Sequence, residues 1–150
     1  ISFDDHMQFH LNDATIDLLH YGPAHTTGDT AVLFREANLV HMGDVFNASY
    51  PFIDAGNGGD IEGMIRFCKN VLDRLDEDST VIPGHGPVMG YEELADYIDM
   101  LETVASRIDA MIDAGMSLED VMAADPTAGF DERYGDPGRL INRAYMSLSR

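Results

Sequence analysis

Short, largely apolar and β-prone runs dominate the first third of the sequence. Four such runs occur before residue 45, and Asn12-Asp13 between the first two is a typical turn dipeptide. The segment 45–59 follows them and contains Pro51 and the run Gly-Asn-Gly-Gly, which favours a long irregular loop of the kind that often carries function. The pattern predicts a hairpin and a second strand pair, with strands at 7–11, 15–21, 31–34 and 39–42.

Apolar residues recur at helical spacing in most of the remaining sequence. From Asp60 onward they fall on one face of a helix. Ser117 with Asp120 resembles a capping box, and Asp136-Pro137 is typical of an N-cap followed by a first helical turn. The sequence therefore predicts helices over 60–75, 91–114, 117–125 and 136–148, with a short buried strand at 80–82.

The length and composition fit one domain. The chain has 150 residues, of which 45% are hydrophobic, so it can fill a packed core. We expect a single α/β (α+β) domain over 1–150, with a strand-rich part at 1–58 and a helix-rich part at 59–150. No internal repeat or linker interrupts it.

The charge narrows the range of partners. The chain is an acidic protein, with 27 acidic against 9 basic residues and a formal net charge of −18. Such a surface repels phosphate backbones and anionic lipids, so nucleic acid and membrane surfaces are disfavoured as partners. No run approaches the roughly 18 to 20 apolar residues of a membrane span, so we expect a soluble protein, in periplasm or cytoplasm alike.

The single cysteine and the first residues add little chemistry. With Cys68 alone, the chain forms no intrachain disulfide and assembles no cysteine-based zinc site, and we interpret Cys68 as a small buried hydrophobe. The sequence opens on Ile1 instead of Met, so we expect that a preceding segment has been removed.

Three short segments could carry chemistry. In the first, a predicted strand runs into Gly22-Pro23 and leaves His25 on the loop beyond the strand end, where an imidazole can offer a lone pair to a metal. A solvent-exposed loop histidine is an equal alternative. In the second, an aliphatic strand ends at Gly43-Asp44, where the carboxylate could bridge two cations. The alternative is an Asp that bonds its own turn.

The third segment holds a histidine in unusual surroundings. A buried strand delivers His85 between two glycines, each of which is flanked by a proline. Glycine allows close backbone approach and proline stiffens the turn, so the imidazole is held without crowding. This arrangement favours a metal ligand over a filler histidine.

Together, the ordered motifs His-Thr-x-Gly-Asp, strand-Gly-Asp and Pro-Gly-His-Gly-Pro resemble the metallo-β-lactamase superfamily of hydrolases. The intervals are 19 residues from His25 to Asp44 and 41 from Asp44 to His85, and the resemblance spans residues 9–87. It implies the C-terminal half of an αββα sandwich, with one mixed sheet and its covering helices. It also implies two zinc ions, with His25 at the first, His85 at the second, and Asp44 bridging them and acting through a metal-bound water.

Asp44 stands where several true β-lactamases carry a cysteine, so the resemblance leans toward the wider branch of thioesterases and lactonases. The substrate would be a small molecule with an ester, thioester, lactone or β-lactam bond. On the long loop, Tyr50 and Asn57 lie where family members place substrate contacts, although an Asn within such a glycine run is more often a turn residue.

One family motif is absent. The opening signature His-x-His-x-Asp-His occurs nowhere in the sequence, and Asp4-Asp5-His6 is not that motif. A catalytic zinc ion usually takes three protein ligands and a water, so this chain should bind zinc weakly and be inactive alone. We expect a fragment that works only with its N-terminal half.

The half-fold leaves one sheet face without its partner layer. That face should include Ile16, Leu18, Val32 and Phe34, and an exposed apolar face predicts association. The partner is the missing N-terminal half or a second copy of the chain, which would give a homodimer. The alternative function is accordingly a self-associating, non-catalytic domain that retains remnant metal ligands.

Overall fold

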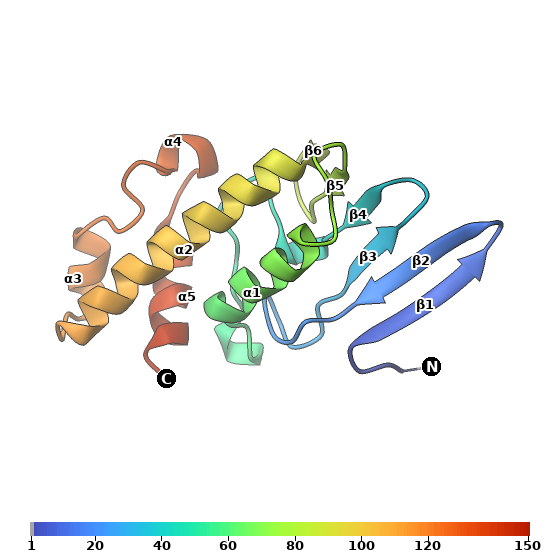
Figure 1. Cartoon of the computed structure of the whole chain (residues 1–150). Coiled ribbons are helices and arrows are strands. Elements are labelled where there is room, and N and C mark those ends of the chain that lie inside the picture. Colours follow the sequence, from blue (N-terminus) through green and yellow to red (C-terminus); the bar gives the residue numbers. More distant parts are fainter. Residues whose placement is uncertain (1) are drawn as a thin grey trace.

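A computed structural model describes residues 2–150, which form one mixed six-stranded sheet with helices packed on one of its faces (Figure 1). The strands follow one another across the sheet in chain order, and only the β4–β5 pair is parallel. Their bounds are β1 His6–Leu11, β2 Ala14–Leu19, β3 Ala31–Phe34, β4 Leu39–His41, β5 Thr80–Ile82 and β6 Met89–Gly90.

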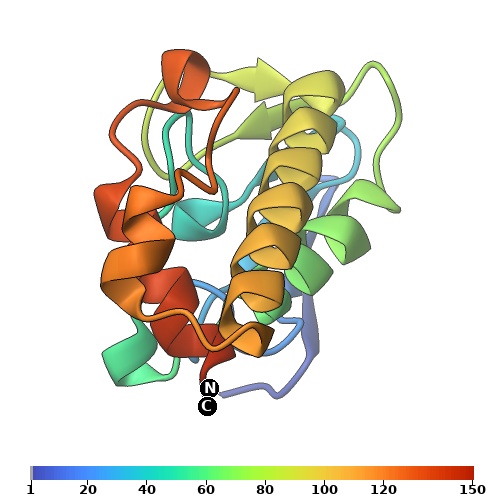
Figure 2. The same cartoon turned by 90° about the vertical axis from the view of Figure 1, so that its left-hand side faces the viewer.

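The two longer helices, α1 and α2, lie beside each other over the sheet (Figure 2). Helix α5 packs against α2 and α3 against α5, whereas α4 lies near the start of α2, where Arg133 pairs with Asp96. The α/β fold class is confirmed. The helices are α1 Ile61–Leu72, α2 Tyr91–Asp113, α3 Leu118–Ala123, α4 Asp131–Tyr134 and α5 Gly138–Leu148, with short 3₁₀ turns η1 Gly43–Val45 and η2 Ala55–Asn57. No helix within residues 2–150 is both long and apolar enough to cross a membrane.

Most element boundaries follow local signals in the sequence. Asn12 and Asp13 both adopt positive φ, at 50° and 62°, and form the tight β1–β2 turn. The carboxylate of Asp60 caps α1 by accepting the Gly63 N–H. The last helix begins two residues later than predicted: Pro137 is its N-cap, and the Asp136 side chain accepts the Gly138 N–H.

The two faces of the sheet have different surroundings. On β2 to β5, the apolar side chains of one face pack under the helices and are at most 8% exposed. These core side chains are Leu19, Ala31, Leu33, Val40 and Val81. The opposite face, which we call the open face, is apolar and only partly covered; the strand register assigns to it Met7, Phe9, Leu11, Ile16, Leu18, Val32, Phe34, Leu39 and Ile82.

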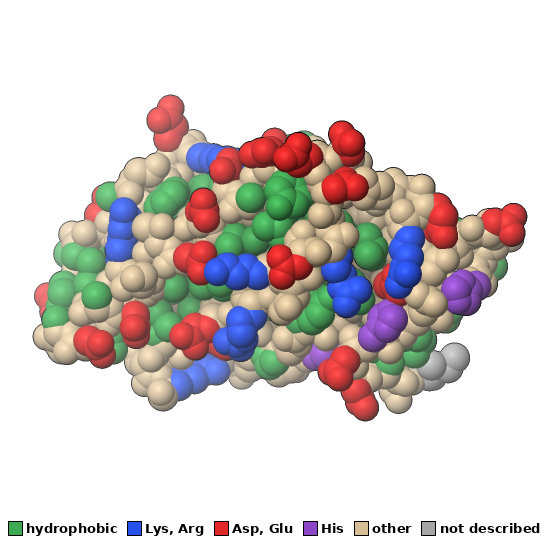
Figure 3. Space-filling view, viewed as in Figure 1, with side chains coloured by type: hydrophobic (Ala, Val, Ile, Leu, Met, Phe, Trp, Pro, Cys, Tyr) green, Lys and Arg blue, Asp and Glu red, His purple; other side chains and the backbone are tan. Residues whose placement is uncertain are grey.

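The open face also lacks the charge that covers the rest of the molecule. On β2 to β5, the polar side chains that share its register are His41 on β4 and Thr80 on β5, and neither is acidic. Acidic side chains are instead spread over the helix-bearing face (Figure 3). An uncharged apolar sheet face suits contact with another apolar layer.

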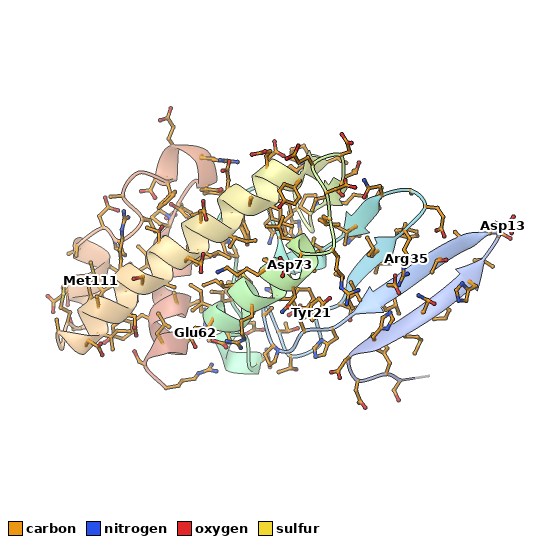
Figure 4. The ribbon with its side chains drawn as sticks, in the orientation of Figure 1. Asp13, Tyr21, Arg35, Glu62, Asp73 and Met111 are labelled. Atoms are coloured by element: carbon orange, nitrogen blue, oxygen red, sulfur yellow. The ribbon has the colours of Figure 1, made fainter. Side chains whose placement is uncertain are left out.

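Asp17 is the one fully buried carboxylate on the core side of the sheet. It accepts hydrogen bonds from Arg35, from His6 at 2.6 Å and from Gln8 at 2.9 Å. Arg35 lies over the sheet near β2 and β3 (Figure 4). Its guanidinium, helped by His6 and Gln8, holds the pKa of Asp17 well below its ordinary value of 3.8, although burial opposes the shift.

We expect Arg35→Met to lower the free energy of unfolding at neutral pH, because it leaves the buried Asp17 carboxylate without its main partner. The folded-state pKa of Asp17 is depressed, so the stability it contributes is present above 3.8 and is lost as the pH falls below that value. Urea unfolding should show a constant gap from wild type above about pH 5 that narrows in acid. Lys69→Met, which breaks an exposed pair with Glu102, is the control and should change little.

Candidate metal centre

Three strand ends meet at one edge of the sheet. Strands β2, β4 and β5 run in the same direction, because β3 is antiparallel to both of its neighbours and β4 is parallel to β5. The loop after β2 carries His25, the η1 turn after β4 carries Asp44, and the turn after β5 carries His85. The topology therefore brings together side chains that lie far apart in the sequence.

The three side chains converge around the Asp44 carboxylate. Nε2 of His25 lies 3.7 Å from Oδ2 of Asp44, and Nε2 of His85 lies 3.2 Å from Oδ1. Each carboxylate oxygen thus faces one imidazole. They border a cavity of about 310 Å³ whose walls are His25, Asp44, Asn47, Ser49, Tyr50, Phe52 and His85.

The His25 ring is fixed by the backbone of the long loop. Its Nδ1 lies 2.5 Å from the carbonyl oxygen of Phe52, which can only accept, so Nδ1 carries the proton. Nε2 then carries the lone pair and points toward Asp44. The Asp54 N–H also donates to the His25 carbonyl at 2.9 Å, which ties this loop to the one after β4. Such an outer hydrogen bond is typical of metal-binding histidines.

Close backbone packing positions Asp44 against the turn that carries His85. The Gly84 N–H donates to the Phe46 carbonyl at 3.0 Å, and the Ala48 N–H donates to the His85 carbonyl at 3.1 Å. A Cβ at position 84 would stand 2.3 Å from Oδ1 of Asp44 and 2.7 Å from the Gly43 backbone. Only glycine fits at position 84, so Gly84 leaves free the space that the Asp44 carboxylate occupies.

We expect Gly84→Ala to displace Asp44 and to destabilise the fold by about 1–3 kcal/mol, as overpacking typically does. Gly28→Ala is the matched control, because a Cβ at position 28 meets nothing within 4 Å and the backbone there does not need positive φ. Thermal unfolding of the two variants checks the prediction. Equal stability of Gly84→Ala and Gly28→Ala would contradict the described packing.

One of the residues that line the cavity, Asn47, carries a buried polar atom that has no partner in the described part of the chain. Asn47 is only 6% exposed, and its Nδ2 donates to the Asp44 carbonyl at 3.1 Å. Its Oδ1 is buried and accepts no hydrogen bond from residues 2–150. A buried amide oxygen with no donor is unfavourable unless something else supplies one. Asn47 could not be predicted from the sequence, because an Asn after a turn carries no distinctive signal.

The two expected substrate contacts lie in different places. Tyr50 lines the cavity and donates its hydroxyl to Asp131 at 2.7 Å; burial, and then this carboxylate, raise the pKa of Tyr50. Asn57 lies in η2, where it donates to the Asp54 carboxylate at 2.6 Å, and it is not among the residues that line the cavity. The position of the Asn57 side chain is therefore explained by its hydrogen bond within the η2 turn.

The three residues do not form a closed cation cage. Within residues 2–150, no group of three His, Cys, Asp or Glu side chains is arranged to hold one ion. Each side of Asp44 offers one imidazole nitrogen and one carboxylate oxygen. A tetrahedral zinc site needs more donors than that.

Sequence comparisons give no match: no protein-family model matches the chain, and no curated protein matches it significantly.

Solved structures, in contrast, share its fold. The stereoselective inverting sec-alkylsulfatase Pisa1 from Pseudomonas sp. superimposes over 96% of this chain with a TM-score of 0.77 and 14% identity. A metallo-β-lactamase from Pontibacter korlensis superimposes over 67% with a TM-score of 0.58 and 16% identity. The DIM-1 metallo-β-lactamase does so over 67% with a TM-score of 0.56 and 21% identity.

The chain therefore has the metallo-β-lactamase fold and spans only part of the length of these neighbours. It covers 25% of the alkylsulfatase and 46–47% of the two β-lactamases. The resemblance inferred from the three sequence motifs is confirmed at the level of the fold.

Proposed function

We propose that this chain supplies one half of a zinc-dependent hydrolase site, in which His25 binds one ion, His85 binds a second and Asp44 bridges the two. The observation that carries the proposal is the pair of imidazole nitrogens that face separate oxygens of one carboxylate, at 3.7 and 3.2 Å. Two imidazoles and a bridging carboxylate are a donor set that suits zinc.

Three features of the structure support the fit. The Phe52 carbonyl fixes the tautomer of His25 so that Nε2 can bind a cation. Gly84 leaves room for the Asp44 carboxylate. The buried Oδ1 of Asn47 could accept a hydrogen bond from a molecule held in the cavity. Bound zinc would acidify a water and polarise the bond to be split.

The proposal includes a partner, because the donor set is incomplete. We propose that a second β-sheet layer packs on the open face and brings the histidines and the aspartate of a His-x-His-x-Asp-His loop. The substrate would be a small molecule with an ester-like bond. The neighbours named above include a sulfatase and β-lactamases, so sulfate esters and β-lactams belong in the substrate panel beside esters, thioesters and lactones.

The test compares this chain with a fusion of the chain to an N-terminal αβ half that carries His-x-His-x-Asp-His. We expect the chain to bind zinc weakly and to hydrolyse none of the panel. The fusion should bind two zinc ions and hydrolyse at least one substrate. A fusion that folds, binds less than one zinc ion and hydrolyses nothing would refute the proposed site.

A second candidate, a self-associating non-catalytic domain, is supported by the open face. Its apolar side chains come from β1 to β5 and carry no acidic group, so a second copy could cover them despite the net charge of −18. This function predicts a folded homodimer with little zinc and no hydrolysis at any zinc concentration. Sedimentation at micromolar concentration, combined with metal analysis, separates the two candidates.

A further inference from the structure

A second cavity adjoins the metal centre on the other side of Phe52. It measures about 510 Å³ and is lined by Phe52, Met122, Gly138, Arg139, Asn142 and Arg143. Phe52 lines this cavity and the one around Asp44. Its ring meets the His25 ring edge-on at 6.0 Å between centroids, and the Arg143 guanidinium stacks over it at 5.1 Å. Phe52 is therefore common to the two cavities and contacts a charged or metal-facing side chain of each.

The second cavity is cationic in an otherwise acidic chain. The sequence has 27 acidic and 9 basic residues, yet α5, from Gly138 to Leu148, contains no acidic residue and two arginines. Arg139 and Arg143 are four residues apart, so they share one face of the helix. Both line the same cavity.

Neither arginine is neutralised by the rest of the described chain. Among residues 2–150, the arginine and lysine side chains that form ion pairs of 4 Å or less are Arg35, Arg66, Lys69 and Arg133, and neither Arg139 nor Arg143 is among them. Like charges at this helical spacing repel each other. An anion between them would remove that repulsion, and the Asn142 amide on the same wall could donate to it as well.

We propose that this second cavity binds an oxyanion group of the substrate (a carboxylate, phosphate or sulfate) while the bond to be split lies over Asp44. The inference rests on the function proposed above and adds the substrate class to it: a small molecule with an anionic group at a distance from the reacting bond. Guanidinium groups pair with such oxyanions through parallel, charge-assisted hydrogen bonds. The substrate would cross the ring of Phe52, which both cavities share.

Amide NMR of this chain, titrated with inorganic phosphate at constant ionic strength, tests the binding site. We expect phosphate to shift the amides of Phe52 and of residues 138–143, with saturation. Arg139→Gln and Arg143→Gln should each weaken this binding about tenfold. Arg66→Gln, which removes a paired arginine on α1 outside both cavities, should leave it unchanged. No saturable shift at 138–143, or an equal affinity in the Arg139→Gln/Arg143→Gln double variant, would overturn the proposal.

A second measurement distinguishes binding of a substrate's anionic group in this cavity from binding of a free anion. In the zinc-loaded fusion, Arg143→Gln should lower the ratio of kcat/KM for a carboxylate-bearing ester over its neutral methyl ester about tenfold. If Arg143→Gln leaves this kcat/KM ratio unchanged although the wild-type chain binds phosphate, the cavity is a site for free anions. That result would overturn the substrate assignment. A zinc titration of the same samples distinguishes the metal-centre proposal from the anion-site proposal. If zinc does not bind but the phosphate shifts are normal, only the metal centre is refuted.

Discussion

In the fusion of this chain to an N-terminal αβ half, replacing Asp44 by Asn should lower the zinc affinity by more than about 100-fold. It should also lower kcat/KM by about 1,000-fold or more. The carboxylate faces both His25 and His85, so its loss would affect both of the proposed ions at once. An amide keeps the size of the side chain but removes the charge and one acceptor oxygen. Metal analysis after dialysis and steady-state kinetics measure the two effects.

The fold should survive this substitution. The Asp44 side chain is 42% exposed, so Asp44→Asn buries no new unpaired group. Asp113→Asn is the matched control, since it removes the same charge at the exposed end of α2. Retention of both zinc ions by Asp44→Asn would contradict the bridging role, whereas an equal loss in both variants would indicate a nonspecific charge effect.

Replacing Val32 by Lys should abolish association through the open face and leave the fold of the chain intact. Val32 is partly exposed and faces away from the helices, so a lysine there remains solvated in the separate chain. Burying that ammonium between two apolar sheets would cost several kcal/mol. Sedimentation should show associated wild-type chain at micromolar concentration and monomeric Val32→Lys with an unchanged circular dichroism spectrum.

The adjacent residue provides the control for this prediction. Leu33 is 8% exposed and points to the opposite face, into the core under the helices. Leu33→Lys should therefore unfold the chain, with a loss of about 3 kcal/mol or more. If Val32→Lys is as unstable as Leu33→Lys, the open face is wrongly assigned. If wild type is already monomeric, the homodimer is excluded.

The strand ends that carry His25, Asp44 and His85 could be predicted from the sequence because each ends in a distinctive local motif. Glycine and proline mark where a strand stops, and the residue beyond it must then lie at a sheet edge. That the three side chains converge on one site was predicted only from the resemblance of the three ordered motifs, taken together, to the metallo-β-lactamase superfamily. The fold confirms that resemblance, while the metal role of the three residues stays a prediction.

Contacts between distant segments could not be predicted in this way. Arg143 stacks on Phe52 from a helix at the other end of the chain, and nothing near either residue signals the pair. Asp17 is buried because the strand register sets it beside Arg35, 18 residues further on. The α4 helix has one turn and lacks a side-chain cap, so the sequence gives no periodic signal for it.

The most direct test of the metal centre is a zinc titration of this chain followed by the imidazole ¹⁵N resonances. Zinc should shift Nε2 of His25 and of His85 together, while Nδ1 of His25 keeps its proton because it donates to the Phe52 carbonyl. The resonances of His6, His10, His20 and His41 should not move. Shifts confined to those four histidines, with His25 and His85 unaffected at millimolar zinc, would contradict the account.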